Sequence, residues 1–431
     1  MIVMRRHLTL LVVLLTAALA ATACSNASTT TTASTASAPT SGAAVNPVIA
    51  WNRTLLEIQA IPGAQPATVH PTRSLAIMHA AVYDAVNAID GRHRGYLVDV
   101  KPAGPASEEA AAAAAADTTL LALYPTQQAL LDTRLASSLA EIPDSPVKQA
   151  GIDLGRDVAR RVLALRDHDG SDTAVPAFVA GPAAGDYQPT PPKLAPPVFS
   201  GWARVTPFTL TRPDQFRPPP PPALTSAAYA EAFNEIKTLG TASGSSRTDD
   251  QTQQGMFWNA PIQNYWNQIA QTVAEQRHAS VPDSARMFAL LNLGVADSVI
   301  ALYDAKYTYH LWRPITAIRN ATTATNPATA PDPAWTPLSP TAPDPSYPGA
   351  HSTISATAAA ILTSLYGPAV HLAVTSPVLA GVTRNFDSFA AARDEAGLSR
   401  IYAGQHTRID HTAGQDLGNT IAAHVLTTTA P

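Results

Sequence analysis

Cysteine is almost absent from this chain: its 431 residues include one, Cys24. A single cysteine excludes a disulfide scaffold and the cysteine-rich zinc motifs. Charged residues make up 14% of the chain, below the roughly 25% of an average soluble protein. The formal net charge is −4, and an acidic chain lacks the basic surface that nucleic-acid binding needs, so we expect no nucleic-acid partner. Because 46% of the residues are hydrophobic, there is enough apolar material for a core.

Sustained β-alternation is also missing, and there is no repeat of about 20–50 residues. Apolar residues recur instead every three or four positions, which is the spacing of an amphipathic helix. The clearest case is 71–90, which begins at a proline and is followed by a glycine. Similar patterns predict helices over residues 104–123, 125–142, 146–167, 225–240, 248–258, 262–277, 283–318, 351–366, 376–396 and 407–426.

Proline is the abundant exception, with 38 residues concentrated in a few stretches. Two of these stretches are 174–224 and 326–348. Proline removes a backbone donor and disfavours helix at the preceding residue, so both predict long loops that wrap the body. We therefore predict an all-α fold over residues 47–431, built as one or two helical bundles with a belt of proline-rich loops.

Residues 1–23 have the features of an export signal. Arg5 and Arg6 precede an apolar stretch over 8–23, which ends in small residues. This apolar run is shorter than the ~20 residues that a membrane span needs. We expect the leader to be removed on export, with the body outside the cytoplasmic membrane.

Cys24 directly follows the small residues of the leader. The sequence Ala21-Thr22-Ala23-Cys24 resembles a bacterial lipoprotein cleavage box, with Ala21 where leucine is usual. The resemblance implies lipidation of Cys24, so the membrane would be reached only through an N-terminal lipid anchor. Simple secretion with an incidental cysteine is the alternative. The segment 24–46 is nearly all Ser, Thr, Ala and Gly, which predicts a flexible tether.

Three clusters in the last third of the chain carry chemistry. In the first, Lys306 and Arg313 are seven residues apart, and Pro314 follows. On one continuous helix they would lie about 20° apart on the same face. Two cations on an apolar face need an anionic partner if they are buried. A pair of solvated cations is the alternative.

The second cluster is Pro348-Gly349-Ala350-His351, directly before an alanine-rich helical pattern. Small residues at a helix start let an anion approach the free backbone N–H groups, where the helix dipole favours negative charge. His351 is placed there to exchange a proton.

The third cluster contains Ser399, Arg400, Gly404, His406 and Asp410. On a helix, the four-residue spacing would let the Asp410 carboxylate hold one imidazole nitrogen of His406 and leave the other free as a nucleophile or a ligand. A metal site is also compatible with this pair, but it would need one or two further ligands from elsewhere.

Together these clusters resemble the vanadium haloperoxidase and type 2 phosphatidic acid phosphatase superfamily. The first and third motifs match its pattern, Lys-x6-Arg-Pro and Ser-Arg-x3-Gly-x-His-x3-Asp. The middle motif departs from it, with Gly349 where serine is usual and Ala350 where glycine is usual. Ser346 and Ser352 are nearby hydroxyls that could replace the missing one. Residues 247–258 resemble the exported bacterial haloperoxidase-like branch.

The resemblance implies an oxyanion pocket. Lys306, Arg313 and Arg400 would bind the equatorial oxygens of vanadate or phosphate. The backbone N–H groups of Gly349 and Ala350 could still donate to the anion, although a serine hydroxyl is missing.

Three further roles are implied for the ionisable side chains. His406 would be the axial ligand to vanadium, or the phosphorylated nucleophile of a phosphatase. His351 would be the general acid and base, and Asp410 would orient His406.

These residues leave three functions open. The first is an exported vanadium-dependent haloperoxidase that uses vanadate, hydrogen peroxide and halide. The second is a soluble acid phosphatase that hydrolyses a small phosphate ester through a phosphohistidine. The third is a non-catalytic surface lipoprotein. The lipid phosphatases of the superfamily have several membrane spans, and no such set of spans is found in this sequence.

Overall fold

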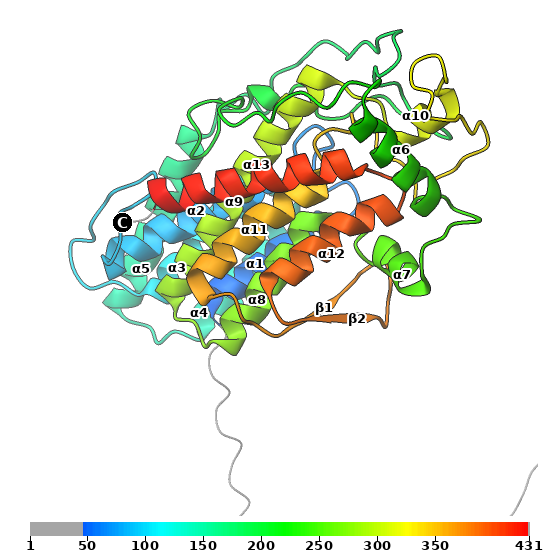
Figure 1. Ribbon diagram of the computed structural model, residues 1–431. Helices are drawn as coiled ribbons and strands as arrows, with labels where there is room; N and C mark the ends of the chain where they lie inside the picture. The colour runs from blue at the N-terminus through cyan, green and yellow to red at the C-terminus, as the bar shows by residue number, and fades with distance from the viewer. Residues whose placement is uncertain (1–45, 430–431) are drawn as a thin grey trace, which may run out of the picture. The chain divides into compact units, whose positions relative to one another are not determined.

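The computed structural model describes residues 46–429 (Figure 1). Helices form nearly all of its regular structure, which confirms the all-α prediction. They are α1 (Pro47–Ala60), α2 (Pro71–Asp90), α3 (Glu108–Leu123), α4 (Gln128–Ala140), α5 (Pro146–Leu165), α6 (Ala227–Leu239), α7 (Asp249–Phe257), α8 (Ile262–Gln276), α9 (Val281–Tyr309), α10 (Pro314–Asn320), α11 (Ala350–Tyr366), α12 (Phe389–Tyr402) and α13 (Arg408–Thr428).

The predicted leader, Cys24 and most of the tether lie outside the described residues. Asn46, the last residue of the predicted tether, caps α1 through its side chain, which accepts from the N–H of Val48 at 3.0 Å. Its amide nitrogen also donates to the carbonyl of Ala279 at 3.0 Å and to the hydroxyl of Ser284 at 2.9 Å. Asn46 therefore belongs to the folded body and is fastened to the start of α9.

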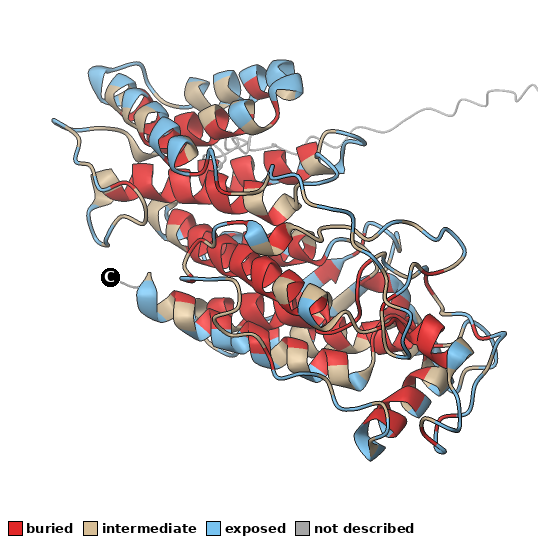
Figure 2. Cartoon of the chain, turned by 90° about the horizontal axis from the view of Figure 1, so that it is seen from above, coloured by how far each residue is buried: buried red, intermediate tan, exposed pale blue. Residues whose placement is uncertain are grey.

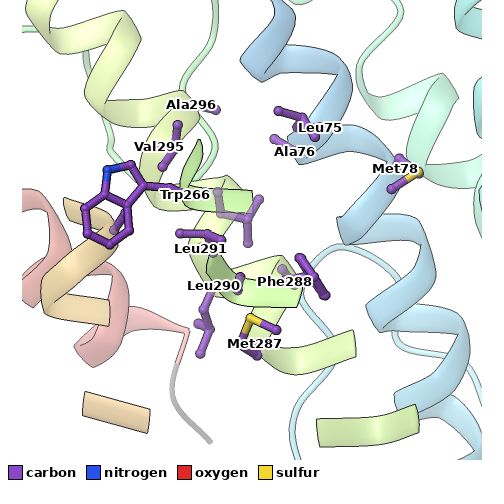
Figure 3. Packing of buried hydrophobic residues seen from close by; sticks show 14 of the residues in the cluster. Leu75, Ala76, Met78, Trp266, Met287, Phe288, Leu290, Leu291, Val295 and Ala296 are labelled. Atoms are coloured by element: carbon purple, nitrogen blue, oxygen red, sulfur yellow. The ribbon is translucent and has the colours of Figure 1, made fainter. Parts of the chain in front are cut away.

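Helix α9 is the centre of the fold. Helices α1, α2 and α3 contact it, and so do α8, α11 and α13. Figure 3 shows Trp266 of α8 on one side of α9 and Leu75 and Met78 of α2 on another. By length and composition α9 could cross a membrane, but 94% of its most apolar window is buried inside the protein. Figure 2 shows the same concentration of buried residues in the middle helices, so α9 is a core helix.

Helices α11 and α13 lie side by side and approach each other backbone to backbone (Figure 1). Small residues make this possible. A Cβ atom on Gly418 would lie 2.2 Å from the carbonyl oxygen of Thr353, and one on Gly414 would lie 2.7 Å from the carbonyl oxygen of Gly349. Since α11 begins at the second motif and α13 begins within the third, this packing sets the distance between the two motifs.

The close packing predicts a cost for Gly418→Ala. Alanine would gain up to about 1 kcal/mol of helix propensity, but its methyl group would push the backbone of α11 away. We expect the free energy of unfolding to fall by about 1–3 kcal/mol, measured by denaturant unfolding. Gly104→Ala is the control, because its methyl group would meet no described atom within 4 Å. Equal stability of Gly418→Ala and the parent would contradict this packing.

The helix predicted for 376–396 is only partly correct. The structure has a two-stranded antiparallel hairpin of β1 (Leu372–Thr375) and β2 (Thr383–Phe386), and α12 starts after it. Pro377 and Gly381 fall in the connecting turn, where they prevent a helix from continuing.

The proline-rich stretches behave as predicted. Residues 174–224 and 326–348, which lie wholly within the described residues, contain no α-helix. Their aromatic side chains pack on the body: Trp202 and Phe208 belong to the main hydrophobic core, and Trp335 to a smaller cluster.

Candidate oxyanion site

Lys306 and Arg313 are both buried, but they do not share a helix. Helix α9 ends at Tyr309, and His310 takes a left-handed conformation with a φ of 35°. Arg313 is the N-cap of α10, which begins at a proline. Because a proline disfavours helix at the residue before it, the chain turns a corner here, and the prediction of a single helical face is wrong.

The two cations meet at Asp344, a buried residue that the sequence argument missed. Arg313 donates to a carboxylate oxygen of Asp344 and, at 2.6 Å, to its backbone carbonyl. The Lys306 ammonium lies 3.6 Å from the other carboxylate oxygen and donates to the carbonyls of Pro345 and Ser346. Burial opposes ionisation of Asp344, yet the charges of Lys306 and Arg313 hold its pKa below the usual range. The sequence held one indication of such a residue, because two buried cations need an anionic partner.

His406 lies directly before α13, next to Arg313. Its Nε2 is 3.2 Å from a guanidinium nitrogen of Arg313. Since a guanidinium can only donate, Nε2 accepts and the ring proton is assigned to Nδ1. Burial, followed by the charge of Arg313, lowers the pKa of His406 well below its usual range. The ring is therefore neutral at neutral pH and carries a lone pair on Nε2.

Asp410 is engaged mainly by its own helix terminus. It is the third residue of α13 and forms a capping box with Thr407. One carboxylate oxygen accepts from the N–H of Thr407 at 2.8 Å and from the hydroxyl of Ser346 at 2.7 Å. The same oxygen lies 3.5 Å from Nδ1 of His406, and that nitrogen makes no hydrogen bond with any described residue. Burial raises the pKa of Asp410, and its orienting role toward His406 stays a prediction.

His351 is the second residue of α11, as the helix-start prediction requires. Its Nε2 is 2.9 Å from the carbonyl oxygen of Trp258. A carbonyl only accepts, so Nε2 carries the proton and Nδ1 is free to accept one. Burial and then the charge of Arg400 lower the pKa of His351 well below its usual range, so the ring is a neutral base at neutral pH.

Arg400 lies in the last turn of α12 and completes the set of buried cations. It donates to the side-chain oxygen of Asn259 at 3.2 Å, while its Nε has no partner among residues 46–429. Burial, and then the charge of Arg313, lower the pKa of Arg400 to about 9. The segment after α7 thus contacts Arg400 through Asn259 and His351 through Trp258, a positioning function that the sequence argument missed.

The start of α11 differs from what was expected. The N–H of Gly349 donates to the backbone carbonyl of Asp410 at 2.9 Å, so the prediction that it donates to an anion is wrong. The N–H of Ala350, the first residue of α11, has no acceptor within its helix and can still donate. The hydroxyl of Ser352 pairs with His411 at 2.9 Å. Because the Ser346 hydroxyl already donates to a carboxylate, neither serine is free to replace the missing hydroxyl.

The cluster has the composition of an oxyanion site. Lys306, Arg313 and Arg400 supply three cations in a buried region, next to the lone pair of His406 and the unpartnered Nε of Arg400. Tetrahedral anions such as vanadate or phosphate fit such a donor set. Within the described chain, no three His, Cys, Asp or Glu side chains gather in a way that would hold a metal cation.

The pKa of Lys306 predicts how anion affinity depends on pH. Burial lowers this pKa to about 8, so the ammonium loses its charge as the pH rises through that value. An anion prefers the protonated form, so affinity for sulfate should be full below about pH 8 and fall by up to about tenfold per pH unit above it. Isothermal titration from about pH 6.5 to 9.5 measures this. The affinity of Lys306→Met for sulfate should stay level over this pH range, because arginine keeps its charge. An identical decline in both proteins would refute the assignment.

Comparison with known proteins agrees with this geometry. Residues 286–430, which include all three motifs, match a family model described as the VCPO second helical-bundle domain. The vanadium chloroperoxidase of Curvularia inaequalis is 23% identical over an alignment of 491 residues, which covers 86% of this chain and 80% of that protein. These matches show that the chain is similar to proteins of the vanadium haloperoxidase superfamily.

Solved structures of vanadium haloperoxidases share the fold. The crystal structure of the first bacterial vanadium-dependent iodoperoxidase superposes with a TM-score of 0.78 at 24% identity, covering 89% of this chain and 96% of that one. A holo-type bacterial vanadium-dependent chloroperoxidase gives a TM-score of 0.66 at 15% identity, covering 86% and 93%. The likeness extends over nearly the whole described body, beyond the region of the motifs.

Proposed function

We propose that this protein is a vanadium-dependent haloperoxidase, which holds vanadate at His406 and uses hydrogen peroxide to oxidise a halide. One observation carries the proposal: the neutral, buried His406 presents a lone pair on Nε2 within a cluster of three buried cations. The similarity to vanadium chloroperoxidase supports the choice of anion.

The residues that would hold vanadate are those already described. Nε2 of His406 would bind the vanadium, while Lys306, Arg313 and Arg400 would offset the charge of its oxygens. The N–H of Ala350 would add a donor at the positive end of α11. When bound, vanadate supplies a Lewis-acidic centre at which peroxide is activated toward halide.

His351 would handle protons in this reaction. With Nε2 held by the carbonyl of Trp258 at 2.9 Å, its Nδ1 is the atom that can take a proton from peroxide and return it later. Because the pKa of His351 is depressed, the ring is neutral before the reaction and its Nδ1 is available to accept a proton.

A soluble acid phosphatase is the second candidate. The same lone pair on Nε2 of His406 could attack a phosphate ester. At Gly349 the serine hydroxyl is missing and the backbone N–H is engaged, so two hydrogen-bond donors to the anion are lost. Their loss would weaken the lasting retention of vanadate more than the transient binding of a substrate. The products would be phosphate and an alcohol, released through a phosphohistidine.

Export forms part of the proposal. Its support is the leader over 1–23, together with Cys24 and the tether that follow it. In this arrangement the enzyme would work on the outer side of the cytoplasmic membrane, either fastened by a lipid at Cys24 or secreted. Metabolic labelling of the expressed protein with a fatty acid, compared with Cys24→Ala, would test the anchor.

The decisive experiment incubates the full chain with orthovanadate and assays bromination of a cyclic diketone. Activity that needs vanadate, peroxide and bromide together would establish the haloperoxidase. If the folded protein does not brominate but hydrolyses p-nitrophenyl phosphate with inhibition by vanadate, the phosphatase is correct. A folded protein with neither activity would point to the non-catalytic lipoprotein.

A further inference from the structure

Asp344 places a negative charge inside the oxyanion site itself. Its side chain is 7% exposed, and its two carboxylate oxygens face Arg313 and Lys306, two of the three cations that an oxyanion would use. Asp410, the other carboxylate nearby, is engaged with the start of α13 instead. An anion entering the site would thus share its cations with a carboxylate of the protein.

Several contacts fix Asp344 in place. Arg313 binds both its side chain and its backbone carbonyl. The carbonyls of the next two residues, Pro345 and Ser346, accept from Lys306. Because these contacts hold both the side chain and the backbone of the segment, we expect the Asp344 carboxylate to stay beside the cations when an anion binds.

We propose that Asp344 is an internal counter-anion that sets the affinity of the site for oxyanions. It neutralises part of the charge of Lys306 and Arg313 and repels a second anion at short range, so the site binds vanadate or phosphate more weakly than three free cations would. This inference rests on the oxyanion site of the proposed function. Asp344 acts through its charge on the two cations and is not expected to touch the reacting atoms.

The substitution Asp344→Asn tests this role, because asparagine keeps the shape and removes the charge. We expect the dissociation constants for inorganic phosphate and for orthovanadate to fall by about 10- to 100-fold. Isothermal titration calorimetry at about pH 6 measures them, because Asp344 raises the pKa of Lys306 and its loss would favour the uncharged amine at higher pH. Asp344→Ser is a second neutral variant, in case the amide disturbs folding. Near-ultraviolet circular dichroism reports whether each variant keeps its packing.

Asp169→Asn is the matched control. Asp169 is also a buried carboxylate that binds two arginines, Arg73 and Arg166, which come from α2 and the end of α5. Removing its charge should disturb stability but leave the anion affinity unchanged.

The outcomes separate this role from a purely structural one. If Asp344 only held the cations in position, its neutral variants would bind anions more weakly, and that result would overturn the proposal, as would an unchanged affinity. Tighter binding by folded neutral variants supports it, including the case in which the parent binds too weakly to measure. If neither the parent nor the variants bind either anion, the proposed function and this inference both fail.

Discussion

His406→Ala is expected to abolish retention of vanadate and, with it, all peroxide-dependent halogenation. The substitution removes the Nε2 lone pair that would bind vanadium in the proposed function, while Lys306 and Arg313 remain bound to Asp344. We expect vanadate affinity to fall by on the order of a thousandfold or more, which corresponds to about 4 kcal/mol. Equilibrium dialysis with orthovanadate measures the binding, and the diketone assay measures the turnover.

His371→Ala is the control for this experiment. His371 is an exposed histidine whose ring lies 3.4 Å from Asp387 near the hairpin, and its loss should change neither binding nor turnover. Persistent vanadate binding by folded His406→Ala protein would show that the three cations suffice and that the role proposed for His406 is wrong.

His351→Ala is expected to separate binding from turnover. His351 does not hold the anion in the proposed arrangement, but it moves protons at Nδ1, so vanadate affinity should change by less than about threefold. The rate of halogenation should fall by about 10²- to 10⁴-fold, the usual contribution of a general acid or base. The affinity is measured by dialysis, and the turnover number at saturating peroxide.

His351→Gln provides a second readout. Glutamine can still donate to the carbonyl of Trp258 but cannot carry a proton in the reaction, so it should keep the local packing and remain slow. If vanadate binding collapsed in both variants while circular dichroism showed an intact fold, the assignment of His351 to proton transfer would have to be abandoned.

The helices could be predicted from the sequence wherever their apolar period was long and uninterrupted. Helix α2 runs over Pro71–Asp90, the predicted range. The apolar period gave a wrong prediction after α9, where one helix was expected over 283–318. The apolar pattern continues through His310, although Pro314 excludes a continuous helix. It failed again at the hairpin, where short strands are too brief to establish an alternation.

The sequence predicted which residues form the site, but it predicted few of the contacts that these residues make with one another. The motif spacing identified three cations and two histidines, all of which the structure brings into one region. Asp344 lies outside the three motifs. Its role could not be predicted because its contact with Lys306 exists only in the folded structure. The pattern Thr407-x-x-Asp410 is a capping box, a signal present in the sequence that competes with the role expected of that aspartate.

The attachment of Asn46 to the start of α9 has a practical consequence for immobilising the protein. Lys306 lies in the last turn of the same helix, and 29 residues of α-helix span about 43 Å. Material coupled upstream of residue 46, such as a resin or an electrode surface, would therefore hold the molecule at the end remote from its reactive groups. We expect N-terminal coupling to leave diffusion of small reactants to those groups unobstructed.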